Sequence, residues 1–539
     1  MATDATTVTY LPPFVGGVTR VLSTWMSEFV SVRDFGAAGD GVTVDSMAFA
    51  NAMNAAGTVI VPPGMYRFSS NFTIPSGKRL VMRDGAQLTI DNTFTLTIRG
   101  LVEAGTGQIF VGAGKVLGLR TVRPEWFGAT RTGTAHDDAP AFRKAQLCME
   151  AGITSDGDDM VMLLSSGSYG LASQVACTPN TQSCIQWRGQ GSHSGTTLIS
   201  MASWTGSNGV LALVANPVNS QGSACRFTGF RIVPQTVGSG STIGVIIGGD
   251  AVLTLQGGAH EGALFEDVGV NEFFNCWHIK NARLFQFRRC SAWNESAINS
   301  TCVAILAGQA GQFAGDLDFY NFQAVANASG SKCLQVLSSA ATSQIAGLRF
   351  HSQIMYRGPI EIVATGGGKV SDVWFTAGWQ YDVVAGNGFV IGADGAGSQV
   401  ARLQFHGGYY AGGLVNSFKA FNIFTSNSGK CQGIDITGNY FTQTWGDVIF
   451  LSGIKQATVS GNHFVDPNGG SLIYFAGCVG VVVTENILTR LSSTGSVAYL
   501  VSNGGGSNYY SIRSNLSSGF GSTVNDASPG AQRVVDGNF

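Results

Sequence analysis

In the second half of the chain, apolar residues recur at fairly regular intervals. Acidic residues follow several of them at a similar separation in the sequence. Glycoside hydrolysis needs two carboxyl groups that face one sugar, and one of them must donate a proton. Adjacent coils of a β-solenoid lie about 4.8 Å apart, so acids at equal depth in neighbouring coils meet that need. Counting seven or eight residues past the apolar anchors Phe265, Phe287, Phe319, Phe350 and Phe375 gives a polar column: Glu272, Glu295, Asn327, Arg357 and Asp382. We therefore expect Glu272, Glu295 and Asp382 to be catalytic candidates and Arg357 to bind substrate.

A second polar set lies one residue to either side of the same anchors. It contains Asp318 and Arg349 ahead of two successive anchors and His351 after one of them. Asp316 and Asp318 lie one coil beyond Glu295, so Glu295 with either Asp is the leading catalytic pair, with Arg349 and His351 binding the sugar. The alternative is a ladder of exposed ion pairs, which are common and weak: Glu266 with Arg288, and Asp318 with Arg349.

Aromatic residues lie close to these polar positions in the sequence. The C–H faces of sugars pack on flat rings, while sugar hydroxyl groups seek polar partners. We expect Trp293, Trp379 and Tyr381 to contact the substrate. The alternative is that these rings pack between loops.

The elements that must position these residues are short apolar strands, which recur every 22 to 32 residues from Phe265 onward. Each alternates apolar and polar residues, so one face is buried and the other is solvated. Repetition of such a unit predicts an all-β solenoid whose coils stack on one core. The in-facing anchors are Phe265, Phe287, Phe319, Phe350, Phe375, Phe405, Ile436, Val459, Val483 and Ile512, with Phe227 as a looser first member. A column of Gly and Asn from Gly378 to Asn515 predicts tight turns after the later anchors.

The pattern changes along the chain and divides it into four regions. Residues 1–30 carry a weak helical signal and are a candidate attachment segment, with a disordered tail as the alternative. Residues 31–224 hold a duplicated loop–helix–strand element and the first coils. Residues 225–515 form the coil stack with the glycan groove, and residues 516–539 form a C-terminal tail.

The duplicated element predicts short helices that cap the solenoid. Asp45 and Asp138 stand where they can cap helix N-termini, and Phe49 and Phe142 fall in the first buried turn of each helix. A helix over the open end of a solenoid covers its unpaired last coil.

The composition excludes several classes of partner and cofactor. The 539 residues include 74 Gly, 12% are charged, and the net charge is −2 without a basic cluster, so nucleic acid and anionic membrane are poor partners. The ten Cys form no C-x-x-C pair, and we expect buried free thiols. No tight acidic cluster suggests a calcium site, and we expect no metal and no other cofactor. Neither a signal peptide nor a membrane span is evident.

The first copy of the duplicated element carries a family resemblance. Residues 29–43, which run from Phe29 through Asp34-Phe35-Gly36-Ala37 to Thr43, resemble the opening of the pectate-lyase-like domain of bacteriophage tailspikes. Residues 124–129, which contain Trp126-Phe127-Gly128-Ala129, resemble a second such element in those proteins. The family usually has Asp-Asp before its helix, whereas the first copy has Val44-Asp45.

The resemblance implies a right-handed parallel β-helix, a homotrimer and a role at the bacterial surface. The expected protein is a virion tail component, made in the host cytoplasm, that attaches to a phage tail or adaptor protein through residues 1–30. It would bind and depolymerise capsular polysaccharide or lipopolysaccharide O-antigen, most simply as a hydrolase. A polysaccharide lyase of the same fold and a non-catalytic adhesin are the alternatives.

Overall fold

The computed structural model of the chain forms two compact units, residues 1–170 with 183–188 and residues 171–182 with 189–539. The structure describes residues 6–151, 159–177, 184–206, 209–213, 225–248, 260–261, 263–382, 386–412, 419–427, 429–444, 446–490, 497, 499–518, 523–527 and 533–539.

The first unit contains three short coils covered by a helix. The first coil consists of β4 (Thr58–Val61), β5 (Gly64–Phe68) and β6 (Phe72–Ile74), and each strand pairs in parallel with the strand three places later. α2 (Ser46–Ala55) packs buried Phe49 against the rings of Tyr66 and Phe68, so it covers the core of the first coil. The next two coils are β7 (Arg79–Met82), β8 (Ala86–Ile90), β9 (Thr95–Ile98), β10 (Leu101–Glu103), β11 (Phe110–Val111) and β12 (Lys115–Leu117).

The predicted duplication is present in the structure. η2 (Val32–Phe35) precedes α2, and η3 (Pro124–Phe127) precedes α3 (Ala139–Glu150), which buries Phe142. The predicted capping by Asp is wrong in detail, because neither carboxylate bonds the first turn of its helix. The Asp45 carboxylate accepts hydrogen bonds from the backbone N–H groups of Ala38 and Arg67, and that of Asp138 accepts one from Thr130. Both carboxylates therefore hold the preceding loop in place.

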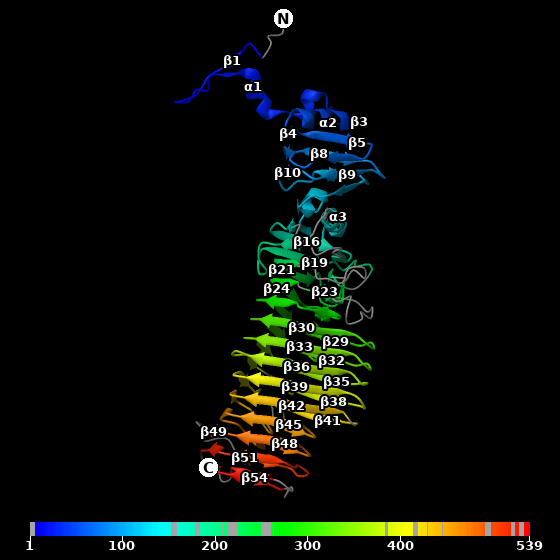
Figure 1. The fold of residues 1–539 in the computed structure, drawn as a ribbon. Helices are drawn as coiled ribbons and strands as arrows, with labels where there is room; N and C mark the ends of the chain where they lie inside the picture. The colour runs from blue at the N-terminus through cyan, green and yellow to red at the C-terminus, as the bar shows by residue number, and fades with distance from the viewer. Residues whose placement is uncertain are drawn as a thin grey trace. The chain divides into compact units, whose positions relative to one another are not determined.

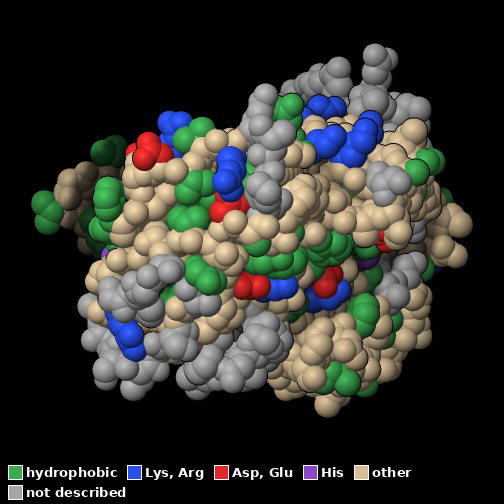
Figure 2. Space-filling model, turned by 90° about the horizontal axis from the view of Figure 1, so that it is seen from below, with side chains coloured by type: hydrophobic (Ala, Val, Ile, Leu, Met, Phe, Trp, Pro, Cys, Tyr) green, Lys and Arg blue, Asp and Glu red, His purple; other side chains and the backbone are tan. Residues whose placement is uncertain are grey.

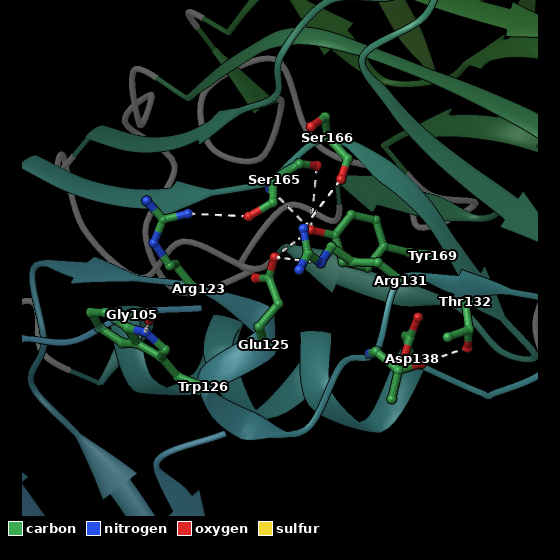
Figure 3. A network of polar contacts seen from close by, with 11 residues as sticks. Gly105, Arg123, Glu125, Trp126, Arg131, Thr132, Asp138, Ser165, Ser166 and Tyr169 are labelled. Atoms are coloured by element: carbon green, nitrogen blue, oxygen red, sulfur yellow. Dashed lines mark hydrogen bonds and ion pairs between the residues drawn. The ribbon is translucent and has the colours of Figure 1, made fainter. Parts of the chain in front are cut away.

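A buried carboxylate supports the second copy of this element (Figure 3). Glu125 on η3 is 2% exposed, accepts a hydrogen bond of 2.8 Å from the Tyr169 hydroxyl and lies 3.5 Å from the Arg131 guanidinium. Burial and the neighbouring carboxylate raise the pKa of Tyr169, so its hydroxyl stays a donor. Arg123 donates to Ser165 beside them. The network ties η3 to β16 (Gly167–Leu171).

The second unit is a right-handed parallel β-helix, as the sequence predicts. Its strands stack as parallel rungs, with β30, β33 and β36 on one side and β29, β32 and β35 on another (Figure 1). The strands that carry the candidate residues are β21 (Arg226–Pro234), β24 (Leu264–Asn271), β27 (Gln286–Arg288), β28 (Ser291–Asn294), β30 (Phe313–Tyr320), β31 (Gln323–Ala326), β33 (Gln344–His351), β34 (Ile354–Tyr356), β36 (Lys369–Thr376), β37 (Gln380–Asp382), β39 (Gln399–His406) and β40 (Tyr409–Ala411). The sheet on the other side includes β25 (Asn275–Ile279), β29 (Thr301–Ala307), β32 (Lys332–Ser338), β35 (Ile360–Ala364), β38 (Phe389–Asp394) and β41 (Phe421–Ser426).

The predicted anchors form the core of this β-helix. Every anchor is at most 1% exposed, and each pairs in register with the next. The Phe rings stack on one another, with centroids 4.5 Å apart for Phe350 and Phe375 and 4.6 Å apart for Phe287 and Phe319. Stacked rings bury a large apolar area at a fixed spacing, so they also fix the register of the strands.

A ladder of buried Asn side chains closes the turn after the later anchors. Asn439, Asn462, Asn486 and Asn515 each donate from Nδ2 to the Oδ1 of the next Asn, the last to Asn538. Each also donates to a backbone carbonyl of the preceding coil. This confirms the predicted structural role of the Asn column.

Gly408 takes the place of Asn one coil before this ladder. A Cβ atom at Gly408 would lie 1.8 Å from the Trp379 indole ring, so only glycine leaves room for that ring.

The sequence predicts the secondary structure at the N-terminal end of the chain but not at the C-terminal end. The weak helical signal corresponds to α1 (Leu22–Met26) and η1 (Ser27–Phe29). The predicted C-terminal tail instead continues the coils, because β52 (Leu516–Ser517), β53 (Val524–Asp526) and β54 (Arg533–Asp536) pair in parallel with strands of the preceding coil.

Nine cysteines are described, and all nine are buried free thiols, as the sequence predicts. Burial raises the pKa of the Cys276, Cys290 and Cys333 thiols to about 12. The side chain of Cys184 lies outside the described residues.

Candidate functional site

A hollow of about 310 Å³ opens on the outward side of the β-helix, beside Trp293. Its floor follows one register column, in which Arg231, Gly269, Ser291 and Gln323 are successive neighbours. Gly269 has no side chain and Ser291 has a short one, so a gap opens between the longer side chains of Arg231 and Gln323. The lining residues are Ser192, His193, Arg231, Gly269, Asn271, Arg289, Cys290, Ser291, Trp293, Asn321 and Gln323.

Two features of the hollow suit a sugar. The Trp293 side chain belongs to a residue that is 39% exposed, so its ring is open to contact. Asn271 pairs with Trp293 in register, and its Oδ1 is buried without a hydrogen-bond partner among the described residues. A sugar ring that packs on the indole can donate a hydroxyl hydrogen bond to this oxygen.

Cationic groups also line the hollow. The Arg231 guanidinium donates from Nε to the Thr197 hydroxyl at 2.9 Å. Arg289 forms an ion pair of 2.8 Å with Glu266, which corrects the expected pairing of Glu266 with Arg288. His193 and Ser192 also line the hollow, and the Ser192 hydroxyl donates to the Asp267 carboxylate at 2.7 Å. The hollow therefore offers donors and positive charge to a ligand.

Glu272 is a structural carboxylate, which corrects its prediction as a catalytic residue. Its two oxygens accept backbone hydrogen bonds from Glu295, Ser296 and Ala297 at 2.9, 3.0 and 3.0 Å. These bonds hold the loop that carries Glu295, two residues beyond Trp293. Glu295 itself is exposed, and its carboxylate has no hydrogen bond or ion pair among the described residues. It is free to meet a ligand.

The predicted polar column is spread over neighbouring columns. In register, Trp293 lies beside Val325, and Val325 lies beside Tyr356, which pairs with Asp382. The coil of Asp382 has one more residue in its turn, since Gln380 follows its anchor by five positions and Ile354 follows its anchor by four. Two coils separate Glu295 from Asp382, so the two lie roughly 14 Å apart along the stack. That is too far for either hydrolytic mechanism.

The outward faces of β30, β33 and β36 carry the second predicted set. Asp318 forms an ion pair with Arg349, whose guanidinium also lies over the Trp374 ring. His351 stacks on Tyr320 and shares a hydrogen bond of 3.0 Å with Thr376. These groups satisfy one another as the ladder alternative expects. Acidic and basic side chains also lie next to each other on a mainly uncharged surface in Figure 2.

The predicted pairing of Glu295 with Asp316 or Asp318 is wrong. Asp318 lies opposite Gln286 in β27, whereas Glu295 follows β28 on the other side of the turn. The four residue-to-residue steps from Ser291 to Glu295 alone span roughly 13 Å. Asp316 lies 3.9 Å from Arg283 and adopts a left-handed backbone conformation with φ of 52°.

Two of the three predicted sugar-binding rings are buried, which corrects their assignment. Trp379 and Tyr381 are each 1% exposed. Trp379 packs against Gly408 and the Phe389 ring, and the Tyr381 hydroxyl donates to the Gly358 carbonyl at 2.6 Å. Burial raises the pKa of Tyr381. Both rings belong to the core, and only Trp293 is open to a ligand.

Arg357 and Asp382 lie together in adjacent coils, as the sequence predicts. The Arg357 backbone N–H donates to the Asp382 carbonyl, and its guanidinium lies 5.0 Å from the Tyr356 ring centroid. Partial burial raises the pKa of the Asp382 carboxyl from its ordinary value of 3.8, and the positive charge of Arg357 opposes this rise.

Replacing Asp382 by Asn is expected to raise the melting temperature slightly at pH 7 and to have no effect at pH 3. Because the folded pKa lies above the unfolded one, ionisation of Asp382 weakens the fold. This penalty is absent below the unfolded pKa and complete above the folded pKa. Thermal melts of both proteins across this pH range measure it. A difference in melting temperature that is the same at pH 3 and pH 7 would contradict the assignment.

The hollow contains functional candidates that the sequence analysis missed: Ser192, His193, Arg231, Asn271 and Arg289. Three of them, Ser192, His193 and Arg231, belong to coils before that of Phe265, where the anchors are irregular. The sequence contains one signal of the hollow, namely the small residues Gly269 and Ser291 at outward positions. Their register neighbours with long side chains are known only from the structure.

The N-terminal part of the chain matches a known family. Residues 29–98 match the model of the family described as rhamnogalacturonase A/epimerase, pectate lyase-like. The resemblance to a pectate-lyase-like domain is thereby confirmed for this segment. No curated protein sequence matches the chain.

Solved structures with a similar fold include proteins from a phage and from two bacteria. Tailspike protein 3 of bacteriophage CBA120 is 11% identical with a TM-score of 0.29, and 97% of this chain spans 64% of that protein's length. DFA-IIIase from Arthrobacter chlorophenolicus A6 is 12% identical with a TM-score of 0.40 over 78% of this chain and 98% of that one. A mannuronan C-5 epimerase A-module from Azotobacter vinelandii is 15% identical with a TM-score of 0.21 over 94% and 98%. These likenesses concern the fold alone.

Two further features concern the described residues. They contain no group of three or more His, Cys, Asp or Glu side chains placed to hold a metal ion. No helix among them has the length and apolar character needed to cross a membrane.

Proposed function

We propose that this chain is a bacteriophage tailspike that binds a bacterial surface polysaccharide, either capsule or O-antigen, and cleaves it. The observation that carries the proposal is the hollow beside Trp293, where an open indole ring, an unpartnered amide oxygen and two guanidinium groups meet. The pectate-lyase-like match over residues 29–98 supports it. A trimer placed on the virion tail through residues 1–30 belongs to the same proposal.

Glu295 is the carboxyl group that we assign to the cleavage step by hydrolysis. It is exposed beside the hollow, and its backbone is fixed by the Glu272 carboxylate. Its role is to protonate the glycosidic oxygen as the bond to the leaving sugar breaks. Water adds to the anomeric carbon, and the proton that this water loses restores the Glu295 carboxyl group. Because Glu272 and Asp318 are both engaged elsewhere, Glu295 is the acid available for this step.

Elimination is the second candidate reaction, and the charges of the hollow favour it. In a lyase, a base removes the C5 proton of a uronate, the C4–O4 bond breaks, a C4–C5 double bond forms, and the departing oxygen takes up a proton. Arg231 can neutralise the uronate carboxylate, and His193 supplies a base.

Replacing Trp293 by Ala is expected to weaken polysaccharide binding by about tenfold or more, since stacking and burial of an aromatic ring contribute roughly 1–3 kcal/mol. The substrate is purified surface polysaccharide from the host, and the readouts are binding, release of reducing ends and absorbance near 232 nm. Tyr409→Ala is the control, because Tyr409 is 43% exposed on the same β-helix away from the hollow.

Each outcome separates the alternatives. Release of reducing ends without 232 nm absorbance supports hydrolysis, and a rise at 232 nm supports elimination. Binding without either signal identifies an adhesin. A Trp293→Ala variant that binds as well as the Tyr409→Ala control would overturn the site.

A further inference from the structure

We propose that the hollow selects a sugar unit that carries an anionic group, and that the Arg231 guanidinium determines this selection. The inference rests on the proposed function, because it names the unit of the polysaccharide that occupies the hollow. The shared chemistry is a carboxylate, sulfate or phosphate on a pyranose ring.

Arg231 is held in place with most of its hydrogen-bonding capacity unused. Its Nε donates to the hydroxyl of Thr197, its buried register neighbour in the preceding coil, so the guanidinium is anchored to that coil. A guanidinium has five donors. No carboxylate forms an ion pair with Arg231 among the described residues. A half-buried cation without a counter-ion is stabilised by an anionic ligand.

The other basic residues that line the hollow already have partners among the described residues. Arg289 is neutralised by Glu266. Asp267 accepts the hydroxyl hydrogen of Ser192, which lies 3.4 Å from His193 Nδ1. Arg231 is therefore the strongest attraction that the described residues offer to an anion in the hollow.

An acidic sugar can make three separate contacts in the hollow at the same time. Its C–H face packs on Trp293, a hydroxyl donates to the unpartnered Oδ1 of Asn271, and its anionic group accepts from Arg231. Gly269 and Ser291 form the floor and leave the space, since a Cβ atom at Gly269 would lie 3.2 Å from the Ser291 hydroxyl and 3.6 Å from Arg231 Cβ. A neutral sugar makes the first two contacts and leaves the guanidinium desolvated without a partner, which costs affinity.

The test uses the full chain and three small probes: glucuronate, glucose 6-phosphate and glucose. The readout is the change in tryptophan fluorescence that is absent from a Trp293→Phe variant. We expect the two anions to produce this change at concentrations about tenfold or more below that of glucose, as a charge-assisted hydrogen bond predicts. Arg231→Gln is expected to remove the difference. Arg402→Gln is the matched control, because Arg402 is an exposed arginine paired with Asp372 away from the hollow.

The outcomes distinguish this inference from the proposed function. A preference for glucuronate over glucose 6-phosphate identifies a carboxylate, and equal responses identify any anion; both support the inference. Equal responses to glucose and glucuronate overturn anion selection but leave a sugar site at Trp293. A preference that survives in Arg231→Gln overturns the role of Arg231. If no probe changes the Trp293 signal while the polysaccharide still binds and depends on Trp293, only the inference fails; if binding no longer depends on Trp293, both fail.

Discussion

Glu295→Gln is expected to reduce polysaccharide cleavage by about a hundredfold to ten-thousandfold, the range that general acid–base catalysis contributes. Binding is expected to stay unchanged, because the amide keeps the shape of the side chain and the Glu272 bonds involve only backbone N–H groups. Release of reducing ends measures cleavage, and retention of the protein on immobilised polysaccharide measures binding.

The comparison variant is Asp318→Asn, which changes a carboxylate of the outward ladder. Asp318 pairs with Arg349, so its loss is expected to leave cleavage intact. Full cleavage by Glu295→Gln would contradict its catalytic assignment. If the products of that variant also absorb near 232 nm, elimination with His193 as the base explains the result.

The sequence predicts the core of the β-helix because the core follows one rule. Each strand alternates inward and outward positions, and stacking requires the same kind of residue at the same depth in every coil. Phe287, Phe319 and Phe350 therefore identify one another in the sequence and stack in the structure.

The same reasoning fails at the corners, because turn lengths vary. A single extra residue between Phe375 and Gln380 moves Asp382 into the register column of Trp293 and Tyr356. It also turns Trp379 inward, onto Gly408. Beyond the first turn, the number of residues from an anchor therefore no longer gives the register column of a residue. An aromatic ring that is close to a carboxylate in the sequence can also face the core.

The hollow was missed for a different reason. It is formed by small residues, Gly269 and Ser291, and by Arg231 on a strand whose anchor Phe227 stands outside the regular spacing. A search for residues that perform chemistry does not detect a gap between them. The structure shows the gap, because it gives the register neighbours of each residue.

Asn486→Ala is expected to destabilise the β-helix by about 3–5 kcal/mol, because it leaves several buried polar groups without partners. Asn486 is 0% exposed. Its Nδ2 donates to the Val459 carbonyl at 2.9 Å and to Asn515 Oδ1 at 2.9 Å, and its Oδ1 accepts from the backbone N–H and the Nδ2 of Asn462 at 3.1 and 3.0 Å. Each lost partner costs about 1–3 kcal/mol, reduced where water enters the space left by the side chain.

The control for this prediction is Asn538→Ala at the end of the same ladder. Asn538 makes the same kind of bonds to Asn515 and Ile512, but it is half-buried, so water can replace the lost amide. We expect a loss of about 1 kcal/mol there. Guanidinium unfolding, followed as a midpoint or as an unfolding rate, compares the two variants. Equal losses at Asn486 and Asn538 would mean that burial does not set the strength of the ladder. A larger loss at Asn486 would show that the ladder stabilises the coils by satisfying backbone groups that water cannot reach, since each coil of a solenoid depends on its immediate neighbours.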